Sequence, residues 1–269
     1  MDIFQAIIIA IIEGLTEYLP ISSTAHMIFA SSYYGIQEDD FVKLFQVSIQ
    51  FGAILAVVAL YWRKFFDFKR INFYVKLACA VIPALLLGKL FDEMIEQVLG
   101  NPIPIAIVLI LGGIVLLFID NYFKNPTITK EEDISIKKAV TIGFWQCLAM
   151  MPGTSRAAAS IIGGMQQGLT REAAAEFSFF LAVPTMLAVT VYSVFLKTYE
   201  HSGLKGFELL TQTPDNMKFF FIGNAIAFVV AIIAIKGFIG LIKKYGFRPW
   251  GWYRIVAGVL LLAYFLTYK

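Results

Sequence analysis

The amino-acid sequence predicts an all-α polytopic membrane protein with six transmembrane helices plus two re-entrant broken-helix hairpins in an inverted-topology repeat. Hydrophobic residues make up 59% of the chain and charged residues 15%, a more apolar composition than soluble domains show. Six apolar runs approach the roughly 20 helical residues that cross a bilayer. Prolines and polar residues interrupt two further apolar segments, and such breaks at membrane depth need the cover of protein or a watery cavity.

Six apolar runs predict the spans, and the basic residues between them predict the orientation. The spans are about 44–61, 73–90, 103–119, 177–196, 219–239 and 251–267. Lys and Arg concentrate after the first, third and fifth spans, and short basic loops face the cytoplasm. The residues counted are Arg63, Lys64, Lys69, Arg70, Lys124, Lys130, Lys137, Lys138, Lys236, Lys243, Lys244, Arg248 and Arg254. The loops near 62–72, 120–138 and 240–250 are therefore expected in the cytoplasm.

This orientation constrains the two segments that precede the first and fourth spans. Segment 1–40 either crosses the membrane once or forms a hairpin that enters and leaves on the outside. Pro20 near its middle favours the hairpin, because proline stops a helix. Segment 139–170, broken at Pro152-Gly153, must enter and leave on the inside. Both segments are therefore expected to be re-entrant hairpins.

The chain is then a single integral membrane domain, residues 1–269, that contains two copies of one unit. Repeat 1 covers about 1–119, repeat 2 covers about 139–267, and the cytoplasmic loop 120–138 joins them. Weak sequence similarity at an offset of 132 pairs Pro20 with Pro152 and Ser23 with Ser155. Because the first unit starts outside and the second inside, the repeats are expected to be inverted, with their broken helices meeting near mid-membrane.

The first hairpin carries two carboxylates between apolar runs, where ionisable residues are costly and mark a functional site. Glu13 and Glu17 are four residues apart, so a helix places them on one face. Either a cation neutralises this pair or one carboxylate is protonated. Carboxylate oxygens suit Mg²⁺ or Ca²⁺, which also accept phosphate oxygens of a substrate. The alternative is a helix mouth wet enough to solvate both.

Hydroxyls and an imidazole follow the carboxylates. Pro20 stops the helix, and Ser22, Ser23 and Thr24 offer an N-cap to a new one, whose free N–H groups form an anion site. His26 lies in the first turn of that helix. We interpret it as a nucleophile or general base, the alternative being a core histidine bonded to a carbonyl.

The second hairpin places an arginine beside another helix start. Arg156 follows the break at Pro152-Gly153, and its fork of donors matches phosphate geometry. It could also neutralise Glu13 or Glu17. Gln50 on the first span is expected to line the cavity or to bond a neighbouring helix. Acids, an arginine and two helix N-termini together indicate a phosphate or pyrophosphate site with a divalent cation.

Two motifs resemble those of the undecaprenyl-diphosphate phosphatases, the bacitracin-resistance family. They are Glu13-Gly-Leu-Thr-Glu17-Tyr-Leu-Pro-Ile-Ser-Ser-Thr-Ala-His26 and Pro152-Gly-Thr-Ser-Arg156. The resemblance covers essentially the whole chain and implies hydrolysis of undecaprenyl diphosphate to undecaprenyl phosphate and inorganic phosphate. This reaction would recycle the lipid carrier of cell-wall synthesis and confer bacitracin resistance. The sequence departs from the family pattern at Ala157 and Ala158, where Ser and Gly are usual, and at Ser160, where Thr is usual.

The resemblance also implies roles for individual residues. The expected catalytic residues are Glu13, Glu17, Ser23, His26 and Arg156, with Glu13 and Glu17 handling metal and proton transfer. The expected substrate-binding residues are Ser22, Thr24, Gly153, Thr154, Ser155 and Gln50. The nucleophile is Ser23, His26 or water, and we favour a Ser23/His26 unit. The expected cofactor is Mg²⁺ or Ca²⁺.

A secondary transporter or a lipid flippase is the alternative function, because inverted repeats with broken helices are transporter architecture. The expected partners are a prenyl diphosphate lipid and membrane lipids, with a homodimer left as an option. Basic residues in short loops report topology and indicate no nucleic-acid partner. The expected location is the bacterial cytoplasmic (inner) membrane, with the active site open to the outer face.

Overall fold

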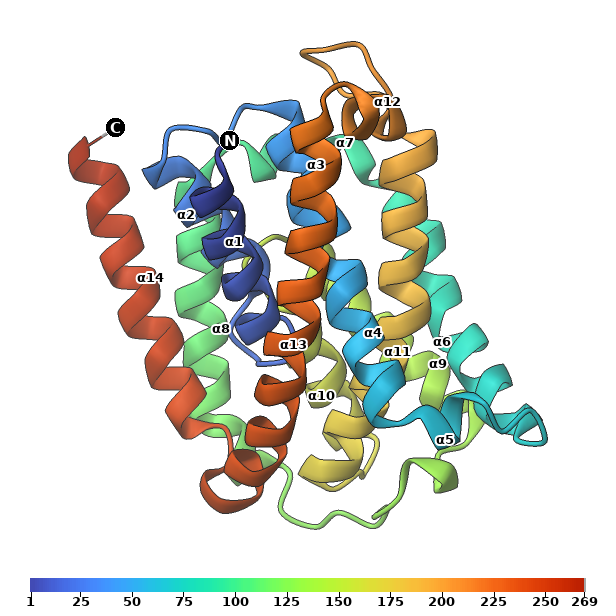
Figure 1. Cartoon of the computed structure of the whole chain (residues 1–269). Coiled ribbons are helices and arrows are strands. Elements are labelled where there is room, and N and C mark those ends of the chain that lie inside the picture. The colour runs from blue at the N-terminus through green and yellow to red at the C-terminus, as the bar shows by residue number, and fades with distance from the viewer. Residues whose placement is uncertain (269) are drawn as a thin grey trace.

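The computed structural model describes residues 1–268, and every named element in them is helical (Figure 1). The side chains outside this description are Lys89, Asp92, Glu93, Glu96, Gln97 and Tyr268. The helices are α1 (Ile3–Thr16), α2 (Ser23–Tyr33), α3 (Asp40–Ser48), α4 (Gln50–Leu60), α5 (Trp62–Phe65), α6 (Ile71–Leu90), α7 (Asp92–Leu99), α8 (Pro102–Tyr122), η1 (Glu131–Asp133), α9 (Ile136–Cys147), η2 (Leu148–Met150), α10 (Arg156–Gln166), α11 (Arg171–Val191), η3 (Tyr192–Leu196), α12 (Gly206–Thr211), α13 (Pro214–Tyr245) and α14 (Arg248–Tyr268).

Within the described residues 1–268, six helical segments are long and apolar enough to cross a membrane, which confirms the number and order of the predicted spans. They are Asp40–Leu60, Ile71–Gly88, Pro102–Tyr122, Arg171–Leu196, Pro214–Tyr245 and Arg248–Thr267. The first is built from α3 and α4, and the fourth runs through α11 into η3. The protein is therefore a multi-pass helical membrane protein.

The four helices of the two broken segments are too short to cross a bilayer. Helix α1 has 14 residues, a length of about 21 Å at 1.5 Å per residue. The hydrocarbon core is about 30 Å thick. Helices α2, α9 and α10 have 11, 12 and 11 residues. In Figure 1, α1 and α2 lie toward the end of the bundle that carries α12, which we name the upper end, whereas α9 and α10 lie toward the lower end, which carries α5.

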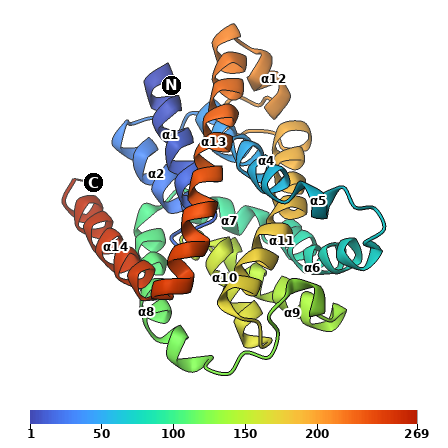
Figure 2. The ribbon, with the colours of Figure 1, turned by 60° about the horizontal axis from the view of Figure 1, so that its bottom comes forward.

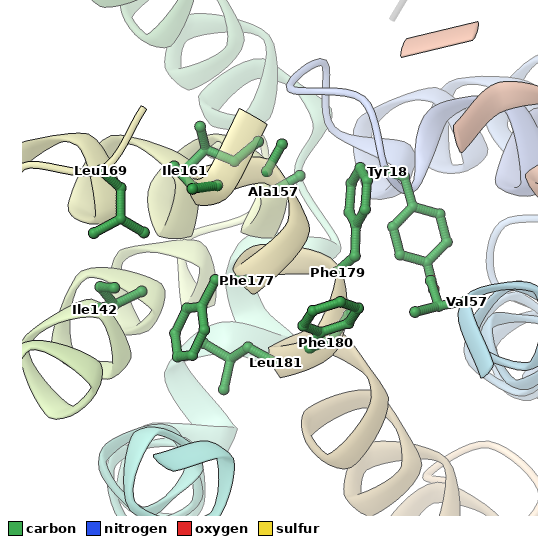
Figure 3. Close-up of a cluster of buried hydrophobic side chains, with 14 of the residues drawn as sticks. Tyr18, Val57, Ile142, Ala157, Ile161, Leu169, Phe177, Phe179, Phe180 and Leu181 are labelled. Carbon is green, nitrogen blue, oxygen red and sulfur yellow. The ribbon is translucent and has the colours of Figure 1, made fainter. Parts of the chain in front are cut away.

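Helix α11 is the centre of the largest buried apolar cluster (Figure 3). Phe177, Phe179 and Phe180 on this helix are at most 2% exposed. Tyr18, which follows α1, meets Phe179 edge to face with 5.2 Å between the ring centroids, and its hydroxyl donates to the Ala53 carbonyl at 3.0 Å. The loop after α1 is therefore fixed against both α11 and α4. Figure 2 shows α4, α10 and α11 near the middle of the bundle.

One basic residue was wrongly assigned from the sequence. Arg254 was counted with the cytoplasmic loop that follows the fifth span, but it lies within α14, inside the sixth span, and is 0% exposed. Its charge therefore reports nothing about topology. Arg248, at the first residue of the same helix, remains consistent with that count.

Gly52 lets α4 approach the backbone of α13. A Cβ atom at this position would overlap the Asn224 carbonyl, and the Gly52 N–H donates to the Asn224 side chain at 2.7 Å. We expect Gly52→Ala to lower the free energy of unfolding by about 1–3 kcal/mol, the usual cost of overpacking. The measurement is the thermal unfolding midpoint of the purified protein in detergent.

Gly237 on α13 is the matched control for Gly52, because a Cβ atom there meets nothing within 4 Å. Alanine is the better helix former by about 0.5–1 kcal/mol, so Gly237→Ala should leave the midpoint unchanged or raise it. If both substitutions lowered the unfolding midpoint equally, the close approach of α4 to α13 would not be the cause of the destabilisation.

Candidate active site

Glu17 joins the two broken segments of the chain. Its Oε1 atom lies 2.9 Å from Nη2 of Arg156, and its Oε2 atom accepts a hydrogen bond from Ser23 Oγ at 2.5 Å. The side chains of Glu17 and Arg156 are 7% and 12% exposed. Three of the five predicted catalytic residues therefore meet at one buried point, although Arg156 is 139 residues from Glu17 along the chain.

Both short helices at this point begin with the same local structure. Ser22 and Ser155 are the N-caps of α2 and α10, and their hydroxyls accept from the N–H groups of Ala25 and Ala158. Their φ angles are 70° and 74°, a region that residues other than glycine rarely adopt. Backbone outliers of this kind cluster at functional sites. The next residue after each cap is Ser23 or Arg156, so both side chains project from a helix N-terminus, where anions bind.

The guanidinium of Arg156 is held on several sides. Nη1 donates to the carbonyl and to the hydroxyl of Ser178 at 3.0 and 3.2 Å. The guanidinium carbon lies 5.5 Å from the centre of the Tyr18 ring. Nε has no acceptor among the residues that the structure describes. Arg156 is thus fixed in place and keeps an N–H group for an anionic ligand.

Glu13 lies one helical turn before Glu17 and is 0% exposed. Neither of its carboxylate oxygens has a hydrogen-bond partner within the described part of the chain. An unpartnered buried carboxylate beside a second one fits the site of a hard divalent cation. In residues 1–268, apart from the side chains left out above, no group of three His, Cys, Asp or Glu residues gathers to hold a metal.

A cavity of about 640 Å³ opens from this point. Five of the six predicted substrate-binding residues line it, namely Ser22, Thr24, Gly153, Ser155 and Gln50. The cavity also contacts Lys43 and Lys197, which flank the predicted spans and stand out only weakly in the sequence. Thr154, the sixth predicted residue, is absent from the described wall, and its carbonyl accepts from Arg254 Nη1 at 2.9 Å.

Gln146 is a buried polar residue of the cavity wall that lies outside both sequence motifs. Its Nε2 atom donates to the Thr185 hydroxyl at 3.1 Å. Its Oε1 atom has no donor among the described residues. A glutamine in an apolar segment gives no stronger signal in the sequence than any interhelical hydrogen bond would.

His26 faces away from the cavity, and the structure does not bring it to Ser23. Its Nδ1 lies 2.8 Å from the Ser22 carbonyl, which can only accept, so Nδ1 carries the hydrogen. Its Nε2 lies 2.8 Å from the hydroxyl of Tyr253, whose ring stacks on the imidazole with 5.6 Å between centroids. Both ring nitrogens are therefore occupied, Nδ1 at the N-cap of α2 and Nε2 in a contact between α2 and α14. The sequence contains no signal for Tyr253, because the partner lies 227 residues away.

The fold and this site define a multi-pass membrane protein with a polar cavity at the N-termini of two helices. The family model described as "Bacitracin resistance protein BacA" matches residues 6–260. An undecaprenyl-diphosphatase of Flavobacterium psychrophilum is 52% identical over 97% of this chain and 95% of its own length. The undecaprenyl-diphosphatase of Flavobacterium johnsoniae is 50% identical over 97% and 96%, and that of Porphyromonas gingivalis is 45% identical over 99% and 98%. The chain belongs to the BacA family.

The two carboxylates are expected to affect stability in opposite directions. Glu13→Gln removes an ionisable group that is buried without a hydrogen-bond partner among the described residues, and should raise the free energy of unfolding, because burial makes the charged carboxylate costly. Glu17→Gln leaves Arg156 without its carboxylate, and breaking such a buried pair costs about 3–5 kcal/mol. Thermal unfolding in metal-free detergent solution measures both, and a midpoint lowered equally by the two substitutions would contradict this assignment.

Proposed function

We propose that this protein hydrolyses undecaprenyl diphosphate to undecaprenyl phosphate and inorganic phosphate, and thereby recycles the lipid carrier of cell-wall synthesis and confers bacitracin resistance. The observation that carries this proposal is the meeting of Glu17, Ser23 and Arg156 at the starts of two helices, on the wall of one cavity. Helix N-termini and an arginine bind phosphate, whereas a hydroxyl bonded to a carboxylate adds the means to attack it. The names of the relatives support the same substrate.

The geometry favours Ser23 as nucleophile and Glu17 as its proton acceptor. Ser23 Oγ already donates to Glu17 Oε2. In the step we propose, Oγ attacks the terminal phosphorus, its proton passes to Glu17, and the anhydride P–O bond breaks with undecaprenyl phosphate as leaving group. Water then attacks the phosphoserine, which releases phosphate and restores Ser23. A diphosphate bound to Arg156 competes with Glu17 for the guanidinium charge, which favours the transfer of the proton to Glu17.

Glu13 and Glu17 are the residues that would hold a divalent cation, Mg²⁺ or Ca²⁺. The unpartnered oxygens of Glu13 support this proposal. When bound, such a cation neutralises charge on the phosphate oxygens. Arg156 and the N–H groups at the starts of α2 and α10 orient the diphosphate, and Ser22, Thr24 and Ser155 line its surroundings.

We also infer that α1–α2 and α9–α10 are re-entrant hairpins of two inverted repeats, about 1–119 and 139–267. The short lengths of these helices and their placement toward opposite ends of the bundle support this inference. Helices α2 and α10 begin 133 residues apart and have equal length. The sequence offset of 132 therefore pairs the hairpins one residue out of structural register, because Ser22 rather than Ser23 corresponds to Ser155 as the N-cap.

The same reasoning gives the orientation in the bacterial cytoplasmic membrane. Arg63 and Lys64 on α5 and Lys243 and Lys244 at the end of α13 carry positive charge at the lower end, which we assign to the cytoplasm. The cavity contacts Lys43, near the start of α3 at the upper end. The active site is therefore proposed to open to the outer face.

Phosphate release from undecaprenyl diphosphate by the purified protein tests the function directly. We expect turnover that EDTA abolishes, with Glu17→Ala and Arg156→Ala each reducing kcat/KM by at least about 10²-fold, the cost of removing one charge-stabilising group. Arg171→Ala is the matched control, because Arg171 also pairs with a carboxylate, Asp120 at 2.7 Å, away from the cavity wall. Folded wild-type protein that moves the lipid without releasing phosphate would establish the transporter or flippase alternative instead.

Separate substitutions distinguish Ser23 from His26. Ser23→Ala should reduce kcat by at least about 10³-fold, because it removes the attacking oxygen. Tyr253→Phe removes the hydrogen bond between α2 and α14, and His26→Ala removes in addition the bond of Nδ1 to the Ser22 carbonyl. Both should cost less than the about 10²–10⁴-fold that a general acid or base contributes. Trapping of a ³²P-labelled phosphoserine in acid-quenched wild-type protein is the second measurement. A loss of kcat for His26→Ala as large as that for Ser23→Ala would instead identify the His26 imidazole as the general base.

A further inference from the structure

Arg254 is a buried cation that the proposed reaction does not use. It lies on α14, is 0% exposed and is absent from the described wall of the cavity. Its hydrogen bonds all go to backbone carbonyls. Nε donates to Leu109 at 3.2 Å, Nη1 to Pro20 at 3.0 Å and Thr154 at 2.9 Å, and Nη2 to Gly153 at 2.8 Å and Val108 at 3.5 Å.

This set of acceptors uses every donor of the side chain. A guanidinium has five N–H groups in a fixed plane, and here each has one carbonyl. No carboxylate of the described residues lies within ion-pair distance of Arg254, so carbonyl dipoles alone compensate its charge. An arginine within a membrane span is costly and is retained for a function. Simple packing of α14 on α8 needs no charge, since Gly113 and Gly251 already bring these helices together.

Three of the five carbonyls, those of Pro20, Gly153 and Thr154, belong to the two helix breaks. Pro20 lies two residues before Ser22, the N-cap of α2, and Thr154 immediately precedes Ser155, the N-cap of α10. One nitrogen, Nη1, bonds both of these carbonyls, so a single atom connects the two breaks. The remaining two carbonyls, of Val108 and Leu109, anchor the guanidinium to α8.

Gly112 on α8 leaves the space that the guanidinium occupies. A Cβ atom at this position would overlap Nη2 and lie 2.7 Å from Cζ of Arg254. The clash would be with the end of a side chain and not with backbone. A substitution at Gly112 would therefore displace the guanidinium while the two helices keep their packing.

We propose that Arg254 is a positioning residue for the reaction, and this inference rests on the proposed function. It holds the first residue of α2, Ser23, and the first residue of α10, Arg156, in the relative position that Glu17 requires to bond both. It acts through the carbonyls of Pro20, Gly153 and Thr154 and does not touch the substrate. Lysine cannot replace it, because one ammonium offers three donors from a single point to acceptors spread around a planar fork.

Two variants test this proposal in the phosphate-release assay. Arg254→Lys keeps the positive charge, and Gly112→Ala keeps Arg254 itself but displaces its guanidinium. Both should lower kcat by about 10²-fold, the effect of misplacing reacting groups by about 1 Å, with a much smaller change in KM. Gly258→Ala is the control for strain between the same two helices, because its Cβ would crowd Ile110 at 2.5 Å and the Ala106 carbonyl at 3.0 Å without reaching the guanidinium. It should retain wild-type kcat.

A double-mutant cycle separates positioning from general destabilisation. Arg156→Lys already disturbs the group that Arg254 is proposed to position, so adding Arg254→Lys should cost much less than it costs alone. A purely structural role predicts instead that the two losses multiply and follow the amount of folded protein, which gel filtration and the unfolding midpoint report. Multiplying losses, or wild-type kcat in folded Gly112→Ala, would overturn the proposal. Absence of phosphate release by the wild-type protein in the same assay would refute the proposed phosphatase activity. Failure of the positioning role would appear only in the variants.

Discussion

The contact between Glu17 and Arg156 exists only because two helices stop inside the protein. A carboxylate and a guanidinium buried from water must compensate each other, or each costs several kcal/mol. A continuous helix would have satisfied its own N–H groups and left no donors for a ligand. Ending α1 at Thr16 and starting α2 and α10 beside Glu17 creates donors where the charges already lie. The ion pair and the helix breaks therefore depend on one another.

Each helix break presents backbone N–H donors on one side and backbone carbonyl acceptors on the other. Ser23 and Arg156 begin their helices on the cavity wall, where a helix N-terminus offers an anion those N–H groups that the caps Ser22 and Ser155 do not bond. The carbonyls of Pro20, Gly153 and Thr154 accept from Arg254, on the other side. Backbone carbonyls at membrane depth must find donors within the protein. One buried arginine supplies donors to three carbonyls of the two breaks and lies away from the cavity wall.

The six spans could be predicted from the sequence because length and hydropathy are local properties. The grouping of Glu17, Ser23 and Arg156 was predictable as well, since prolines and polar residues in apolar segments mark the two breaks. The environment of His26 was not predictable, because helical spacing places it within a turn of Ser23 while the direction of its ring is set by Tyr253 on α14. The assignment of Arg254 to the cytoplasmic loop is wrong because a count of Lys and Arg does not include burial. An arginine exposed to water and one bonded to buried carbonyls contribute equally to such a count.

Charge balance explains why Glu13 belongs to the proposed metal site. Arg156 compensates Glu17, and the charge of Arg254 is committed to carbonyls away from the cavity wall. Glu13, fully buried and without a partner among the described residues, is left over. A diphosphate would bring further negative charge into the same low-dielectric space, where repulsion is strong. We propose that a divalent cation held by Glu13 and Glu17 would offset this repulsion. A proton on Glu13 would remove only one negative charge and add no attraction for the substrate.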